Sequence, residues 1–307
     1  MPSFFIVGSA RSGTTMLRLM LNAHPEVAVP PESRFIVELW HHRNLVRVDS
    51  FLDELGAHKQ FRAWNLGTEA VRRELPGTPT VAYSEAVDAP YKAYARERSK
   101  PSWGDKTPRY IEHIPFLAER FPEARFIHVV RDGRNVALSY ADVPFGPKTV
   151  ARAAELWARR VRLGLEAGRS LAPDRLLELR YEEMVADEDA LTAAAKTICA
   201  FLGIGFDDAL LNYGELSRPE LLDKAKDLNP LVMEGPVAKT RSWQEQMAPH
   251  HVEVFELVAG DTLSELGYPR MFPEPGVRAH VVAALGRKRI PVGRLKRAQR
   301  AAARPTP

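Results

Sequence analysis

Two glycines near the N-terminus, Gly8 and Gly13, constrain the fold of this chain more than any other feature. They enclose four residues, and they separate the apolar run Phe4–Val7 from a helical pattern that begins at Thr14. A short apolar run of this kind is typical of a buried strand. A strand, a tight glycine-bounded loop and a helix N-terminus together form a cradle for an anion, because loop N–H groups and the helix dipole both favour negative charge.

The side chains of this loop strengthen the predicted anion site. Arg11 offers a planar guanidinium for phosphate or sulfate oxygens, and Ser12, Thr14 and Thr15 offer hydroxyl donors around Gly13. The glycine spacing is that of the nucleotide-triphosphate motif G-x-x-x-x-G-K-[ST], but Thr14 stands at the lysine position. Because that lysine reaches the β- and γ-phosphates, its absence counts against ATP-driven phosphoryl transfer. The alternative, a junction with accidental glycine spacing, leaves the arginine and the hydroxyls unexplained.

Strands and helices alternate along the rest of the chain, which predicts an α/β fold with a parallel sheet covered on both faces. Residues 34–100 form an amphipathic, mostly helical insertion, which either covers a ligand pocket or packs only on itself. Further strands are expected at Val27–Val29, 103–108, Ala124–Val130 and Arg175–Leu179, and helices at Arg109–Arg120, 133–140, Val150–Leu171, Asp187–Leu202 and His250–Leu266.

Charge divides the 307 residues into a domain, 1–275, and a basic tail, 276–307. The tail holds nine lysines and arginines and no acid, so the formal net charge of +4 leaves −5 for residues 1–275. An acidic body argues against a nucleic-acid partner. The tail either makes weak contact with an anionic membrane or, in the interpretation we favour, is mobile or docks on the acidic body.

Composition excludes several other classes of protein. Cys199 is the only cysteine, so we expect neither an internal disulfide nor a cysteine-based metal site, and no carboxylate–histidine cluster suggests a metal either. No stretch approaches 18 uninterrupted apolar residues, and the N-terminus lacks the pattern of a signal peptide. We therefore expect a cytoplasmic protein without a metal cofactor.

A second anion site is predicted where the strand 124–130 ends. Arg131 follows that strand, and Ser139 lies eight residues later on the next helix, so the two side chains can converge on one anion. Together with the N-terminal loop, this pair resembles the cofactor site of sulfotransferases that use 3′-phosphoadenosine 5′-phosphosulfate (PAPS). The motifs are most similar to those of the broad bacterial sulfotransferase family, which also resembles tyrosylprotein sulfotransferases. The resemblance covers residues 4–34, 103–108, 124–140, 175–183 and 240–268 in order.

The resemblance implies a fold and a set of cofactor contacts. The fold is a P-loop-like central parallel sheet flanked by helices, with the helical insertion over the acceptor side. Arg131 and Ser139 would bind the 3′-phosphate, Tyr181 would lie near the nucleotide, and Arg241 would belong to a late segment that closes over the cofactor. The 5′-phosphosulfate would be held by the N-terminal loop, through Arg11, Ser12, Gly13, Thr14 and Thr15.

The resemblance also implies catalytic residues. Glu32 matches the family's general base, and Arg34 matches an arginine that holds acceptor or cofactor groups. Lys106 matches an active-site lysine and, with Arg11, would stabilise the charge that develops on the leaving phosphate oxygen. From the residues alone, Glu32 could also be an acid at a helix N-terminus, and Lys106 could equally be a solvated surface lysine.

The function implied is in-line transfer of a sulfuryl group from PAPS to a hydroxyl, leaving 3′-phosphoadenosine 5′-phosphate (PAP), without a metal. The sequence does not select among small-molecule, glycan, lipid and tyrosine acceptors. Two alternatives remain, a P-loop small-molecule kinase and a non-catalytic nucleotide-binding protein. Comparing the affinities for PAP and for Mg-ATP distinguishes a sulfotransferase from the kinase. Catalytic turnover distinguishes it from the non-catalytic protein.

Overall fold

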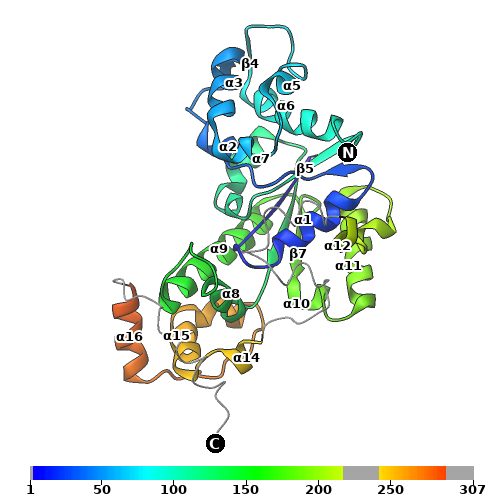
Figure 1. Ribbon diagram of the computed structural model, residues 1–307. Coiled ribbons are helices and arrows are strands. Elements are labelled where there is room, and N and C mark those ends of the chain that lie inside the picture. The colour runs from blue at the N-terminus through cyan, green and yellow to red at the C-terminus, as the bar shows by residue number, and fades with distance from the viewer. Residues whose placement is uncertain (1–2, 217–241, 288–307) are drawn as a thin grey trace, which may run out of the picture.

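A five-stranded parallel sheet lies at the centre of the computed structural model, which describes residues 3–216 and 242–287. The strand order is β2-β5-β1-β6-β7, and every neighbouring pair runs parallel. Helices flank the sheet, which confirms the predicted fold class (Figure 1). The strands are β1 (Phe4–Gly8), β2 (Val27–Ala28), β5 (Ser102–Lys106), β6 (Arg125–Val130) and β7 (Leu176–Arg180).

Both faces of the sheet are buried, as the central strand β1 shows. Phe4 and Ile6 belong to the core formed with α1 and α11, whereas Phe5 and Val7 belong to the core formed with the insertion. Successive side chains of a strand point to opposite faces, so a strand buried on both faces is apolar throughout. The helices outside the insertion are α1 (Thr14–Ala23), α7 (Ile114–Arg120), α8 (Gly133–Tyr140), α9 (Val150–Ser170), α10 (Tyr181–Met184), α11 (Glu188–Leu202), α12 (Tyr213–Leu216), α14 (Trp243–Gln246), α15 (Pro249–Glu265) and α16 (Val277–Arg287), with 3₁₀ segments η1 (Pro108–His113) and η2 (Asp208–Leu210).

The predicted helix over Arg109–Arg120 is wrong in its first half. The structure has the 3₁₀ segment η1 there, and α7 begins only at Ile114. Pro115 explains the break, because proline lacks an N–H and its ring clashes with the preceding turn of a helix. At the first turn of a new helix neither defect matters, so α7 starts immediately before this proline.

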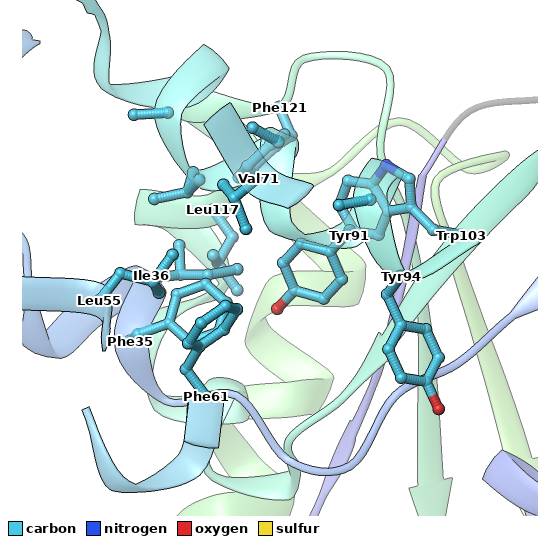
Figure 2. Packing of buried hydrophobic residues seen from close by; sticks show 14 of the residues in the cluster. Phe35, Ile36, Leu55, Phe61, Val71, Tyr91, Tyr94, Trp103, Leu117 and Phe121 are labelled. Carbon is cyan, nitrogen blue, oxygen red and sulfur yellow. The ribbon is translucent and has the colours of Figure 1, made fainter. Parts of the chain in front are cut away.

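The insertion between β2 and β5 is built from five helices and one strand pair. Sequence analysis predicted the helices but not the antiparallel pair β3–β4, whose two strands of three residues are too short to show a period. Figure 2 shows the aromatic core of this layer, in which Tyr91 lies between Trp103 and the Phe35–Phe61 pair. The elements are α2 (Phe35–Glu38), β3 (Leu45–Arg47), α3 (Val48–Ala57), α4 (Lys59–Arg62), α5 (Thr68–Arg72), β4 (Thr80–Ala82) and α6 (Tyr83–Arg96).

The first residues of the basic tail form α16, which packs against α9 and α15 at the opposite end from the insertion (Figure 1). The Thr149 hydroxyl donates to the Gly286 carbonyl at 3.0 Å, and Arg287 pairs with Glu155 at 2.7 Å. Residues 288–307 lie outside the described part of the chain. Within the described ranges, no helix has the length and apolar character needed to cross a membrane.

Candidate active site

The predicted anion loop connects β1 to α1, and both of its glycines are required by close contacts. A Cβ on Gly8 would lie 2.6 Å from the Val129 carbonyl oxygen, and one on Gly13 would lie 2.2 Å from a ring carbon of Tyr181. Both glycines also have positive φ, 147° and 97°. Only glycine adopts such backbone angles without strain, so the spacing that the sequence shows is a structural requirement of this loop.

Arg11 lies at the centre of the predicted cofactor residues. Its Nε donates to the Ser139 hydroxyl at 2.9 Å, and its carbonyl accepts a hydrogen bond from the Arg131 guanidinium at 3.3 Å. Arg11 itself has φ of 76°, the left-handed region that costs a non-glycine residue energy. The structure thus brings together three residues that sequence analysis assigned to two separate phosphate sites.

Arg131 is held from several sides. Its guanidinium carbon lies 4.4 Å from the centre of the Tyr181 ring, a cation–π contact, and the same ring packs on Gly13. The Trp157 indole donates to the Arg131 carbonyl at 3.0 Å. The next peptide N–H, of Asp132, donates to the Glu182 carboxylate at 2.9 Å. Sequence analysis found Tyr181 but not Trp157 or Glu182, since contacts across the sheet leave no local pattern.

Two buried donors of this cluster have no hydrogen-bond partner among the described residues, the Ser12 hydroxyl and the Arg131 Nε. Buried polar groups are nearly always satisfied, so unpaired donors beside a helix N-terminus fit an anionic ligand. Thr14 and Thr15 form the first turn of α1 at the same place. These observations fit the phosphate groups of the cofactor that the sequence predicted.

A second cluster pairs the predicted catalytic residues. Lys106 Nζ lies 2.8 Å from Glu32 Oε1, and Arg34 lies 3.9 Å from Oε2 of the same carboxylate. The Lys106 side chain is only 6% exposed, which rules out a solvated surface lysine, whereas Glu32 remains 36% exposed. Burial raises the pKa of Glu32, but Lys106, Arg34 and Arg18 outweigh it and hold the pKa below its ordinary value.

Strand register brings both clusters to one edge of the sheet. Ile6 of β1 is paired with Lys106 of β5, and Gly8 with Val129 of β6. Because the strands are parallel, their carboxyl ends meet at the same edge. The anion loop and Arg131 follow such ends, and Lys106 is the last residue of β5. Ligands of open α/β sheets bind at this edge.

Other predicted residues fall outside these clusters. Arg241 lies outside the described residues, so its predicted role stays a prediction. Neither His24 nor His128 belongs to the two clusters: His24 hydrogen-bonds the Gly205 carbonyl at 2.9 Å, and burial lowers the pKa of His128 to about 4. In the ranges 3–216 and 242–287, no group of three histidine, cysteine or acidic side chains gathers where it could hold a metal ion.

Comparison with known proteins gives related sequences over most of the chain. The chain is 26% identical over 225 residues to a protein-tyrosine sulfotransferase of Drosophila melanogaster, which covers 71% of this chain and 42% of that protein. It is 28% identical over 291 residues to the nodulation protein NoeE of Sinorhizobium fredii, which covers 86% of this chain and 65% of NoeE. The chain spans about half the length of the protein-tyrosine sulfotransferases it matches.

A solved structure agrees with these sequence matches. The sulfotransferase domain of the Synechococcus PCC 7002 olefin synthase superposes with a TM-score of 0.57 at 26% identity, covering 88% of this chain and 95% of that domain. A protein-family model described as the sulfotransferase family matches residues 2–208, about two thirds of the chain. On this match, and with the anion loop and the Glu32–Lys106 pair on one sheet edge, the chain belongs to the sulfotransferase family.

Proposed function

We propose that this protein transfers a sulfuryl group from PAPS to a hydroxyl of a small-molecule, glycan, lipid or tyrosine acceptor. The observation that supports this best is the placement of a proton acceptor, Glu32, against a buried cation, Lys106, at the sheet edge that also holds the anion loop. The name of one group of relatives specifies protein tyrosine and the name of NoeE specifies no acceptor, so the acceptor class stays open.

The first cluster, the anion loop with Arg131 and Ser139, would bind the cofactor. The N–H groups and hydroxyls at Ser12–Thr15, with Arg11, would hold the 5′-phosphosulfate. Arg131 and Ser139 would hold the 3′-phosphate, with Tyr181 beneath the Arg131 guanidinium. PAPS supplies the sulfuryl group: a bond from sulfur to the acceptor oxygen forms, the bond to the phosphate oxygen breaks, and PAP leaves.

Glu32 and Lys106 act on opposite ends of this displacement. The lowered pKa keeps Glu32 ionised at neutral pH, so its carboxylate can take the acceptor's proton. Lys106, nearly excluded from water, offers its ammonium charge to the leaving phosphate oxygen, where a cation is most effective in a water-poor site. Arg34 lies beside Glu32 and would help hold the acceptor.

The test is transfer of a radiolabelled sulfuryl group from PAPS to four acceptors: a tyrosine-containing peptide, 4-nitrophenol, an oligosaccharide and a fatty alcohol. We expect labelled product from at least one of them. The Glu32→Gln variant should lower kcat by about 10²–10⁴-fold while PAP affinity stays within about twofold, because only the proton acceptor is lost. Transfer of the γ-phosphate of Mg-ATP, without transfer from PAPS, would instead establish the kinase alternative.

A further inference from the structure

The loop that carries Glu32 is strained. Arg34, two residues after Glu32, has φ of 56°, in the left-handed region. A non-glycine residue stays there only when the surrounding structure holds it, and such strain gathers at functional sites. The contacts that hold this loop therefore bear on where the Glu32 carboxylate lies.

Side chains from the insertion hold the two ends of the loop. The Trp64 indole donates to the Pro31 carbonyl at 2.9 Å, and the Tyr83 hydroxyl donates to the Ile36 carbonyl at 2.9 Å. Both aromatic residues are almost fully buried. Two loop carbonyls thus accept hydrogen bonds from side chains of the insertion rather than from water.

The middle of the loop is held by a buried chain of hydroxyls that ends at Asp105. The Ser33 N–H donates to Thr107 Oγ1 at 3.0 Å, and the Ser33 hydroxyl contacts both Thr107 Oγ1, at 3.2 Å, and the Tyr110 hydroxyl, at 2.9 Å. The Ile36 N–H donates to the Tyr110 oxygen at 3.2 Å. Thr107 in turn donates to Asp105 Oδ2 at 3.3 Å.

An ionised Asp105 gives this chain a single direction. An ionised carboxylate can only accept hydrogen bonds, so the Thr107 hydroxyl donates its single proton to Asp105. Its oxygen must therefore accept a hydrogen bond from the Ser33 hydroxyl. Ser33 must then accept from Tyr110, whose oxygen is left free to accept from the Ile36 N–H. Each hydroxyl of this hydrogen-bond chain donates once. The backbone N–H groups of Ser33 and Ile36, both in the strained loop, donate to hydroxyl oxygens of the chain.

The insertion also reaches Asp105 directly. The Tyr91 hydroxyl of α6 donates to Asp105 Oδ2 at 2.7 Å, and its ring stacks on Trp103 with centroids 4.2 Å apart (Figure 2). Asp105 is completely buried and directly precedes Lys106, the partner of Glu32. One carboxylate therefore connects the insertion, the strand that carries Lys106 and the loop that carries Glu32.

We propose that Asp105 is a positioning residue, whose hydrogen-bond chain through Thr107, Ser33 and Tyr110 fixes the Glu32 loop against Lys106 for proton removal. The inference rests on the proposed function, because it gives Glu32 the role of the base. Burial raises the pKa of Asp105 to about 6, which marks the ionised carboxylate as unfavourable in this position. A group that the fold holds at such a cost, in contact with the site, fits a positioning role better than packing.

The test compares two substitutions at Thr107, with a third as control. Thr107→Val keeps the shape and removes the link, whereas Thr107→Ser keeps the hydroxyl. Thr262→Val makes the same change at a buried threonine of α15, away from the site. The measurements are kcat and the KM for PAPS with 4-nitrophenol as acceptor, the Kd for PAP, and amide hydrogen exchange of residues 31–38.

Thr107→Val should lower kcat by about 10²-fold, because a small misplacement of a reacting group costs this much. The KM for PAPS and the Kd for PAP should stay within about twofold. Exchange should accelerate in residues 31–38, and neither Thr107→Ser nor Thr262→Val should reproduce either effect.

Two results would overturn the inference: an unchanged kcat in Thr107→Val, or a loss in Thr107→Ser as large as that in Thr107→Val. If the wild type transfers nothing to any acceptor, the proposed function fails, and hydrogen exchange decides the inference alone. Unchanged exchange at residues 31–38 in Thr107→Val would then show that the hydrogen-bond chain does not hold the Glu32 loop.

Discussion

At the scale of single residues, the pKa values of two acids next to Lys106 are shifted in opposite directions. Glu32 is partly exposed and surrounded by cations, which hold its pKa below the ordinary value despite burial. Asp105 lies one peptide from Lys106 but is fully buried among hydroxyls, and burial raises its pKa to about 6. Hydroxyl donors and one neighbouring ammonium therefore do not offset the loss of water around Asp105.

Asp105 should make folding stability depend on pH. An acid whose pKa is raised in the folded state binds protons more tightly there, so stability falls as pH rises from about 4 to about 6. Asp105→Asn lacks this group. The variant's free energy of unfolding should therefore gain roughly 2 kcal/mol relative to wild type between pH 4 and pH 7.

Urea unfolding of both proteins at the two pH values measures this gain, and the other titrating groups cancel in the comparison. A difference in stability between Asp105→Asn and wild type that is the same at pH 4 and pH 7 would show that the folded-state pKa of Asp105 is ordinary.

At the scale of elements, the anion loop depends on how closely β1, α1 and α10 approach. Gly13→Ala would press a Cβ into the Tyr181 ring, and that ring supports the Arg131 guanidinium. We predict a loss of PAP affinity of about tenfold or more, equivalent to about 1.4 kcal/mol. Calorimetric titration with PAP measures it.

Gly267→Ala is the matched control for Gly13→Ala. Gly267 also has positive φ, 74°, but a Cβ there would meet no atom within 4 Å. It should cost about 1–2 kcal/mol of stability through backbone strain alone and leave PAP affinity unchanged. Equal PAP affinities for Gly13→Ala and wild type would contradict the account of this loop.

The sequence predicts elements well where the signal is local. The apolar run of β1, the glycine spacing and the start of α1 all lie within residues 4–14, and the structure has each of them. The break before α7 also has a local signal, Pro115, but the predicted helix over Arg109–Arg120 ran across it. The pair β3–β4 was not, because three residues show no alternation and their pairing joins segments more than thirty residues apart.

The candidate site shows the same limit. Glu32, Lys106 and the anion loop could be found through short motifs. The Asp105 chain could not, since Ser33, Tyr91 and Tyr110 are common residue types at unrelated positions and only the fold joins them. Arg11 was expected to bind the 5′ group alone, and only the structure shows that it joins Ser139 and Arg131.

At the scale of the whole molecule, the part of the basic tail that the structure describes lies at the end opposite the insertion (Figure 1). Its first part, α16, is docked by buried Ala279 and Ala283 and by the Arg287–Glu155 pair, while Val281 and Leu285 face outward. A truncation meant to test the tail should therefore follow Arg287, so that α16 stays in place.

We predict that removing residues 288–307 leaves PAP affinity within about twofold, because the site is built from other elements. Seven lysines and arginines lie in the removed segment, and the acidic body offers them an intramolecular partner. We therefore expect no sedimentation of the full-length protein with phosphatidylserine vesicles at low salt. Sedimentation that the truncation abolishes would establish the membrane interpretation instead.

The central claim, that the sheet edge binds a 3′-phosphorylated adenosine donor, is tested most directly by calorimetric titration with PAP and with adenosine 5′-phosphate. The two nucleotides differ only in the 3′-phosphate. A charged hydrogen bond is worth about 1.5–3 kcal/mol, so PAP should bind about 10- to 100-fold more tightly. Arg131→Ala should remove most of that difference. Equal affinity of the wild type for the two nucleotides, or tighter binding of Mg-ATP than of PAP, would contradict the account.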